Sequence, residues 1–155
     1  MVKEGTTAPS FKTTDANGEP VNLKDFRGKK VVLYFYPKDD TPGCTKEACS
    51  FRDAFSKFKK QGITILGVSP DSEKSHQKFT AKYKLPFTLL ADTDHSIADA
   101  YGVYGEKKFM GRTYMGIHRT TFLIDEKGKI KKVFEKVKPE DHADEVLGAF
   151  SGVSQ

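Results

Sequence analysis

A run of six apolar residues at positions 31–36 most constrains how this chain can fold. A strand with one face in water alternates apolar and polar side chains, but Val-Val-Leu-Tyr-Phe-Tyr has no polar face. We therefore predict a strand buried on both faces, which requires layers above and below its sheet. A polar segment follows, and then an amphipathic run at residues 48–58. The predicted order is strand, loop and helix.

The rest of the chain also alternates strand and helix patterns, which is typical of parallel strand pairing in an α/β protein. An Asn-Gly pair at residues 17–18 predicts an N-terminal β-hairpin. A second hairpin, antiparallel, is predicted before a last helix that begins at Pro139. The expected bounds are 11–23 for the first hairpin, an unbroken helix after the loop up to Gly62, strands at 63–68 and 87–90, helices at 74–84 and 97–101, a loop at 105–116, and strands at 119–125 and 130–137.

Length, charge and composition restrict the class of protein. The 155 residues suffice for one domain, and we find neither a repeat nor a linker, so residues 1–155 are expected to form a single domain. Basic and acidic residues are interspersed around a net charge of +5, without a nucleic-acid-binding motif, so no nucleic-acid partner is expected. No apolar run approaches the roughly 20 residues of a membrane span, so no membrane is expected either.

Both cysteines lie in the segment that follows the apolar strand. Thr41-Pro42 is a helix-start signal, which places Cys44 at about the third helical position. The N–H groups there lack helical partners and the helix dipole favours negative charge, so a thiolate is stabilised. Without that context, a buried core cysteine would be about as common. The polar loop and the helix start favour a reactive thiol.

Cys49 follows Cys44 by five residues. On an intact helix their Cα atoms would be roughly 8.6 Å apart, beyond the ~7 Å that a disulfide allows. Cys49 is therefore either an inert core residue or a thiol that reaches Cys44 only when the helix unfolds locally. No export signal precedes these cysteines, and thiols in such a chain suit a reducing compartment, so a cytoplasmic location is expected.

The pattern Pro37-x-x-x-Thr41-x-x-Cys44 resembles the signature of the peroxiredoxins, and Cys49 is similar to the second cysteine of the peroxiredoxin Q group, also called bacterioferritin comigratory proteins. The resemblance implies a thioredoxin-like fold, with a mixed central sheet flanked by helices. It implies that Cys44 attacks a hydroperoxide and becomes sulfenic acid. It also implies that Cys49 resolves this acid as an intramolecular disulfide, which a thioredoxin-like dithiol then reduces. The protein is expected to be a monomer without a metal, haem or flavin cofactor.

The same resemblance implies roles for residues around the cysteine. Thr41 is expected to hold the thiolate and the peroxide oxygen, Pro37 to shield the site, and Arg119 to be the family's distant arginine. Arg119 could instead be a strand-end residue that extends into water. Gly43 and Glu47 are further candidates for substrate contact. Glu47 could equally be a first-turn carboxylate that complements the helix dipole.

The four histidines, at positions 76, 95, 118 and 142, show no metal-ligand spacing. We expect His76, His95 and His142 on the solvated surface, whereas His118 adjoins Arg119 and is a candidate to line the site.

A thiol peroxidase is the leading functional prediction. A thiol–disulfide oxidoreductase would normally carry a C-x-x-C pair, which this chain lacks. A redox-responsive binding protein or chaperone is the other alternative, in which unfolding of the helix would expose Phe51 and Phe55.

Overall fold

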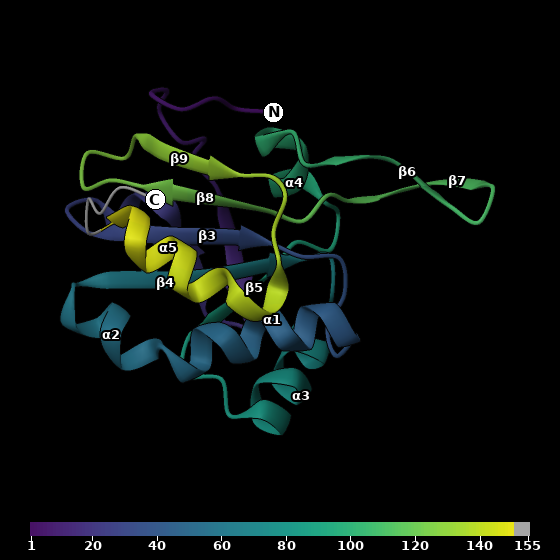
Figure 1. The fold of residues 1–155 in the computed structure, drawn as a ribbon, viewed down its shortest axis with the longest axis horizontal. Coiled ribbons are helices and arrows are strands. Elements are labelled where there is room, and N and C mark those ends of the chain that lie inside the picture. The colour runs from purple at the N-terminus through teal and green to yellow at the C-terminus, as the bar shows by residue number, and fades with distance from the viewer. Residues whose placement is uncertain (151–155) are drawn as a thin grey trace.

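The computed structural model describes residues 1–150, and these form a seven-stranded mixed sheet, a separate two-stranded hairpin, and helices on both faces of the sheet (Figure 1). The strand order is β2-β1-β5-β4-β3-β8-β9, in which β3 pairs parallel to β4 and antiparallel to β8. The strands of this sheet are β1 (Lys12–Asp15), β2 (Pro20–Asn22), β3 (Lys30–Phe35), β4 (Ile63–Ser69), β5 (Thr88–Ala91), β8 (Thr120–Ile124) and β9 (Ile130–Phe134). The predicted mixed sheet and both predicted hairpins are confirmed.

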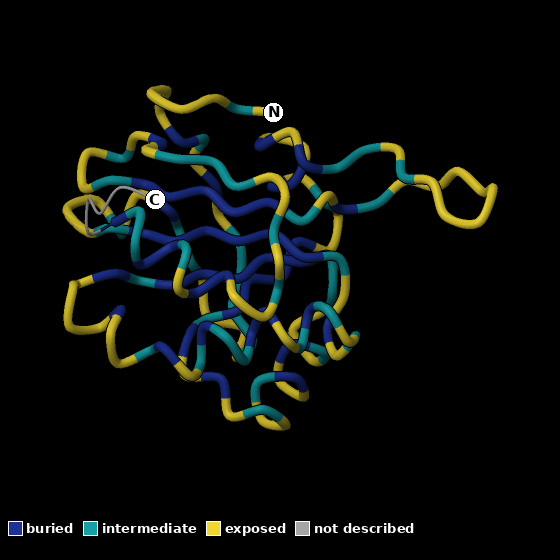
Figure 2. Tube along the Cα trace, in the orientation of Figure 1, coloured by how far each residue is buried: buried dark blue, intermediate teal, exposed yellow. Residues whose placement is uncertain are grey.

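Two hydrophobic cores lie on opposite faces of the sheet, and β3 supplies both. Val32 and Tyr34 point into one core, beneath helices α1, α2, α3 and α5. Val31 and Leu33 point into the other, beneath α4 and the N-terminal segment. The helices are α1 (Pro42–Asp53), α2 (Phe55–Lys60), α3 (Glu73–Tyr83), α4 (Ser96–Tyr101) and α5 (His142–Phe150), with 3-10 turns η1 (Leu23–Phe26) and η2 (Pro139–Asp141). The expectation that β3 is covered on both sides is confirmed, as the dark strands in Figure 2 illustrate.

The expected unbroken helix up to Gly62 is wrong, because the chain leaves helical geometry at Ala54 (φ −98°, ψ 4°) and continues as α2. The bend has a tertiary reason. It lets α1 pack against η2 and α5 while α2 packs against β4. Two smaller differences concern the C-terminal part, where β9 ends at Phe134 and Pro139 opens a 3-10 turn before α5.

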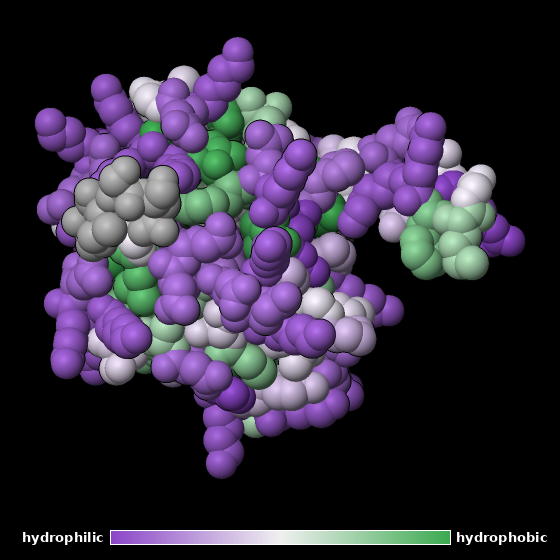
Figure 3. All heavy atoms as spheres, in the orientation of Figure 1, coloured by the Kyte–Doolittle hydropathy of each residue, from purple (hydrophilic) through white to green (hydrophobic). Residues whose placement is uncertain are grey.

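The expected loop at residues 105–116 is also wrong. It is a β-hairpin of β6 (Tyr104–Phe109) and β7 (Arg112–Ile117), which projects away from the body (Figure 1). Met110 (φ 50°) and Gly111 (φ 79°) make its two-residue turn. Neither face of the hairpin is buried along its length, so its sequence lacks the alternation that marks a half-buried strand. Instead the tip exposes Phe109 and Met110, visible as a hydrophobic cap in Figure 3.

Residues 151–155 of the predicted domain lie outside the described residues. Among residues 1–150, none of the helices combines the length and hydrophobicity needed to cross a bilayer.

Gly67 is a point at which the core should not tolerate even one methyl group. It lies on β4, and a Cβ there would be 2.8 Å from Tyr34 Cζ and 2.8 Å from Leu89 Cδ2. We expect Gly67→Ala to lower the free energy of unfolding by about 1–3 kcal/mol through overpacking, as measured by urea denaturation. Gly105→Ala on β6 is the control, since the nearest atom to its Cβ is His118 Nε2 at 3.5 Å. Equal stability of the two variants would contradict the proposed overpacking.

Candidate active site

Cys44 occupies the first turn of α1, as predicted. β3 ends at Phe35, residues 36–41 form a loop, and Thr41 is the N-cap residue with extended backbone (φ −101°, ψ 156°). Pro42 is the first helical residue, which makes Cys44 the third. The thiol is buried, with 2% exposure, and faces the core beneath α1. The unpaired N–H groups and positive dipole end of α1 therefore surround the sulfur.

Arg119 is the cation that approaches this sulfur. Its Nη2 donates a hydrogen bond to Cys44 Sγ at 3.2 Å, across 75 positions of sequence. The sheet topology explains this contact. β8 runs antiparallel to β3, and Thr120 pairs with Phe35, so Arg119 lies at the end of the sheet where β3 delivers the chain to α1. The predicted distant arginine is thus beside Cys44, and the alternative of a strand end in water is excluded.

Glu47 is the second partner of Arg119. Its Oε1 accepts a hydrogen bond from Arg119 Nη1 at 2.5 Å, and its side chain is fully buried. The other oxygen, Oε2, has no hydrogen-bond partner within the described chain. Burial raises the pKa of Glu47 to about 7, although Arg119 opposes this increase. Glu47 therefore holds the guanidinium and is poised to exchange a proton near neutral pH.

Tyr34 lies in the same core, and its hydroxyl likewise has no partner within the described chain. Burial raises the pKa of Tyr34 well above its ordinary value, and the nearby Glu47 and Cys44 add to this effect. The phenol consequently stays neutral. For Arg119, burial disfavours the charge, but Glu47 and Cys44 outweigh it and raise the pKa overall, so the guanidinium stays charged.

Gly43 provides clearance for the arginine. A Cβ at this position would lie 3.3 Å from Arg119 Nη2 and 4.0 Å from Pro139 Cγ. Any larger residue would therefore crowd the guanidinium against Cys44. The substrate contact expected for Gly43 stays a prediction.

Within the described part of the chain, the Thr41 hydroxyl does not hydrogen-bond to the Cys44 sulfur. The Thr41 hydroxyl donates to the Lys38 carbonyl at 2.9 Å, and it forms no capping bond within the described part of the chain. Thr41 and Pro37 are both half-buried. The roles expected for them, holding the peroxide and shielding the site, stay predictions.

Cys49 lies on the same continuous helix as Cys44 and is half-buried. Both cysteines are free thiols. Because α1 is intact between them, a direct disulfide cannot form until this part of the helix unwinds.

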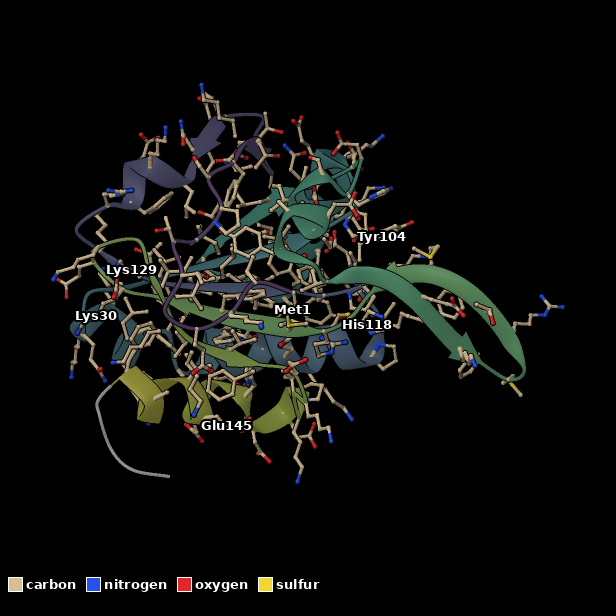
Figure 4. All side chains as sticks on the ribbon, turned by 90° about the horizontal axis from the view of Figure 1, so that it is seen from above. Met1, Lys30, Tyr104, His118, Lys129 and Glu145 are labelled. Atoms are coloured by element: carbon tan, nitrogen blue, oxygen red, sulfur yellow. The ribbon has the colours of Figure 1, made fainter. Side chains whose placement is uncertain are left out.

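Two of the histidine predictions are wrong. His76 and His142 are fully buried rather than solvated. His142 packs edge-on against the rings of Phe51 and Phe134, and its Nε2 lies 2.7 Å from Thr121 Oγ1. The sequence did not reveal this burial, because histidine is hydrophilic and its hydrogen-bond partner here lies in a distant segment. His118 is exposed at the base of the β6–β7 hairpin, where its Nε2 lies 3.1 Å from the Glu106 carbonyl (Figure 4).

Lys107 is a neighbour of the site that the sequence reasoning missed, because its segment was expected to be a loop. It lies on β6 and donates from Nζ to the Ile117 carbonyl at 2.8 Å. Partial burial lowers its pKa, the adjacent Arg119 lowers it further, and Cys44 opposes both effects. A second cation is therefore close enough to Cys44 and Arg119 to interact with both.

Comparison with known proteins identifies this arrangement. A family model described as the AhpC/TSA family matches residues 5–133. Peroxiredoxin Bcp of Escherichia coli strain K12 is 51% identical over 146 residues, covering 94% of each chain. Peroxiredoxin Bcp of Bacillus subtilis is 48% identical over 154 residues, covering 99% of this chain and 98% of the relative. The chain belongs to the peroxiredoxin family.

Solved structures agree with this assignment. The peroxiredoxin resembles peroxiredoxin Q of Xanthomonas campestris with a TM-score of 0.87 and 40% identity, over 93% of this chain and 92% of the other. It resembles BcpB of Mycobacterium tuberculosis with a TM-score of 0.87 and 33% identity, over 100% of both chains. The fold is thioredoxin-like, and the protein is a thiol-dependent peroxidase of the peroxiredoxin Q group.

The buried Glu47 makes the stability of this peroxiredoxin depend on pH. Its folded-state pKa of about 7 lies above the ordinary value of 4.5, so the native state keeps a proton that the unfolded chain releases between these values. The contribution of Glu47 to the free energy of unfolding is fully present below pH 4.5 and is lost as the pH rises through about 7. The loss amounts to about 3 kcal/mol.

Glu47→Gln should remove this dependence, because the amide cannot titrate but still offers an oxygen to Arg119. We expect the unfolding free energy of the variant, relative to wild type, to increase between pH 5 and pH 7.5 in urea denaturation. Glu135→Gln at an exposed position is the matched control. Parallel pH profiles for wild type and Glu47→Gln would contradict the prediction.

Proposed function

We propose that this peroxiredoxin reduces hydrogen peroxide and organic hydroperoxides at Cys44, with Cys49 as the resolving thiol. The observation that carries the assignment is the 3.2 Å hydrogen bond from Arg119 Nη2 to Cys44 Sγ. A guanidinium and helix N–H groups around one sulfur stabilise the thiolate, which is the nucleophilic form. The same donors can stabilise charge that develops on the peroxide oxygens.

The chemistry of the first half-reaction follows from this arrangement. The thiolate attacks one oxygen, an S–O bond forms and the O–O bond breaks. The distal oxygen leaves as hydroxide or alkoxide and takes up a proton to give water or an alcohol. Cys44 is thereby oxidised to sulfenic acid. Thr41 and Gly43, at the start of α1, are the residues we assign to substrate contact, with Pro37 as the shield.

In the second half-reaction the Cys49 thiol condenses with the sulfenic acid, and water leaves as the disulfide forms. The first turns of α1 must unwind for this step, since the intact helix holds the sulfurs apart. α1 starts with a Thr41 side chain directed to Lys38 and a glycine at the second position, so its first turn is held weakly. Cys49 is only half-buried, so it can take part in such a rearrangement.

An external dithiol then supplies two electrons and reopens the disulfide. We assign this role to a thioredoxin-like protein, and we propose that the peroxidase acts as a cytoplasmic monomer. A structure of the Xanthomonas campestris bacterioferritin comigratory protein is described in terms of alkyl peroxide reduction, which supports organic hydroperoxides as substrates. The Arg119 guanidinium and the helix N–H groups at Cys44 suit such substrates, because they are donors for the leaving oxygen.

The two cysteine variants should separate the half-reactions. Cys44→Ser should abolish peroxide consumption. Cys49→Ser should undergo one rapid oxidation of Cys44 and then lose turnover in a coupled assay with thioredoxin, thioredoxin reductase and NADPH. Mass spectrometry after one equivalent of peroxide should find a Cys44–Cys49 bridge in wild type. Peroxide consumption by Cys44→Ser at the wild-type rate would refute the assignment, and wild-type turnover by Cys49→Ser would exclude its resolving role.

Removal of the arginine tests the group that stabilises charge at the sulfur. Arg119→Ala should slow the single-turnover oxidation of Cys44 by about 10²-fold or more, comparable to loss of one transition-state donor. It should also slow alkylation of Cys44 by iodoacetamide at neutral pH, because the guanidinium no longer stabilises negative charge on the sulfur. Arg112→Ala, an exposed arginine on β7, is the control. An alkylation rate of Arg119→Ala identical to that of wild type would eliminate the role.

A further inference from the structure

Asp39 and His76 form a buried acid–imidazole pair, and Asp39 lies just before the helix that carries Cys44. Asp39 belongs to the loop between β3 and α1, and His76 to the first turns of α3. His76 is fully buried and Asp39 nearly so. His76 Nδ1 lies 2.7 Å from Asp39 Oδ2. None of the peroxidase steps above uses either residue.

Hydrogen-bond geometry requires a proton between these two side chains. His76 Nε2 lies 2.9 Å from the Leu90 carbonyl oxygen, which can only accept, so Nε2 carries a hydrogen. A neutral ring would then direct the bare lone pair of Nδ1 at a carboxylate oxygen 2.7 Å away. Two acceptors cannot face each other at that distance in a buried site. The pair therefore holds two protons, one on Nε2 and one between Nδ1 and Asp39 Oδ2.

The surrounding groups favour that proton on the ring. Asp39 Oδ1 accepts from the Tyr36 hydroxyl at 2.6 Å and Oδ2 accepts from Ser75 Oγ at 2.8 Å, so the acid is hydrogen-bonded as a carboxylate. A carboxylate oxygen of Asp71 lies within 4.8 Å of the paired atoms of His76 and Asp39. The ring therefore donates to the Asp39 carboxylate from Nδ1 and to the Leu90 carbonyl from Nε2.

The titratable groups that face the pair come from β3 and from the turn after β4. Tyr36 and Tyr34 on the β3 side remain neutral, because burial raises the pKa of each and the charge of Asp39 adds to it. Asp71 lies in the turn, where it accepts from the backbone N–H of Asp39 at 2.8 Å. α3 contributes the Ser75 hydroxyl and β5 the Leu90 carbonyl. The pair is thus embedded in a polar network of otherwise neutral or negative groups.

This network fastens the loop before Cys44 to α3. Asp40, the next residue, has a left-handed backbone (φ 56°) and accepts from Lys82 Nζ at 2.8 Å and from the Tyr83 hydroxyl at 2.7 Å. Two consecutive loop residues are therefore bound to the same helix. Thr41, Pro42 and Gly43 follow, so the placement of Cys44 against Arg119 depends on where this loop is held.

We propose that Asp39 and His76 are positioning residues for the peroxidase reaction: their buried hydrogen bond holds the loop on α3 and thereby keeps the Cys44 sulfur against Arg119. Removal of the ring frees this part of the loop from α3. Peroxide attack then slows, because the sulfur is no longer held against the guanidinium. The inference rests on the proposed role of Cys44 as the reacting thiol.

Asp39→Asn removes the charge of Asp39 but keeps the contact. The amide Nδ2 can donate to Nδ1 of a neutral His76 while Oδ1 still accepts from Tyr36. His76→Phe instead leaves Asp39 as an unpaired buried carboxylate. The double variant Asp39→Asn/His76→Phe removes that charge. His95→Phe is the matched control, since His95 pairs with Asp99 on the surface, where the Nδ1–Oδ2 distance is 2.9 Å.

The experiment measures single-turnover oxidation of Cys44 by hydrogen peroxide. It uses the Cys49→Ser background, quenched flow and mass spectrometry. Asp39→Asn, which keeps the contact, should be oxidised at close to the wild-type rate. His76→Phe should be slower at pH 7 by about tenfold or more through misplacement of the thiol, with partial recovery in the double variant. Circular dichroism establishes that each variant is folded.

A wild-type rate for folded His76→Phe, or a rate for Asp39→Asn as low as that of His76→Phe, would overturn the proposal. The ring offers an independent readout. ¹⁵N chemical shifts of His76 should show that both ring nitrogens are hydrogen-bonded in wild type. A ring without a hydrogen bond at Nδ1 would also overturn the proposal. Failure of Cys44 to oxidise at any pH would instead refute its assignment as the reacting thiol.

Discussion

The guanidinium of Arg119 is shared between a sulfur and a carboxylate, and the active site depends on that division. One nitrogen donates to Cys44 and another to buried Glu47. Arginine suits this task because its planar fork fixes the angle between the two donors and keeps its charge when buried. Glu47 orients the guanidinium, and Gly43 leaves the space through which it reaches the sulfur. The sheet register between β3 and β8 brings these elements to the same end of the molecule.

The helix that presents Cys44 has two opposed requirements. It must stay folded while the thiolate attacks the peroxide, and it must unwind before Cys49 can approach. Burial of Ala48 and Phe51 in the core favours the folded form, as does a hydrogen bond from the Ala143 N–H to Ser50 Oγ. The weakly held first turn and the break at Ala54 limit how much of the chain must rearrange. Local unfolding of a short segment is therefore compatible with a stable remainder.

Local signals predicted much of the fold and the centre of the site. The solid apolar run of β3, the Asn-Gly turn and the Thr-Pro helix start act within a few residues, so they could be recognised without tertiary information. The same is true of Cys44 in the first turn of α1. Arg119 was identified through family resemblance, whereas its bond to Glu47 depends on strand register, which periodicity does not provide. The burial of His76 and His142 was missed because their hydrogen-bond partners are distant in the sequence.

By itself, the sequence determined that a two-sided strand would deliver a thiol to a helix N-terminus, with a second thiol that an intact helix keeps out of reach. These are consequences of side-chain period and helical rise, which any fold of this chain must obey. Only the tertiary structure decided that the helix bends at Ala54, that residues 104–117 project as a hairpin, and that Arg119 divides its donors between Cys44 and Glu47. Those outcomes depend on packing and charge between segments far apart in the chain, and no local sequence pattern indicates which segments will meet.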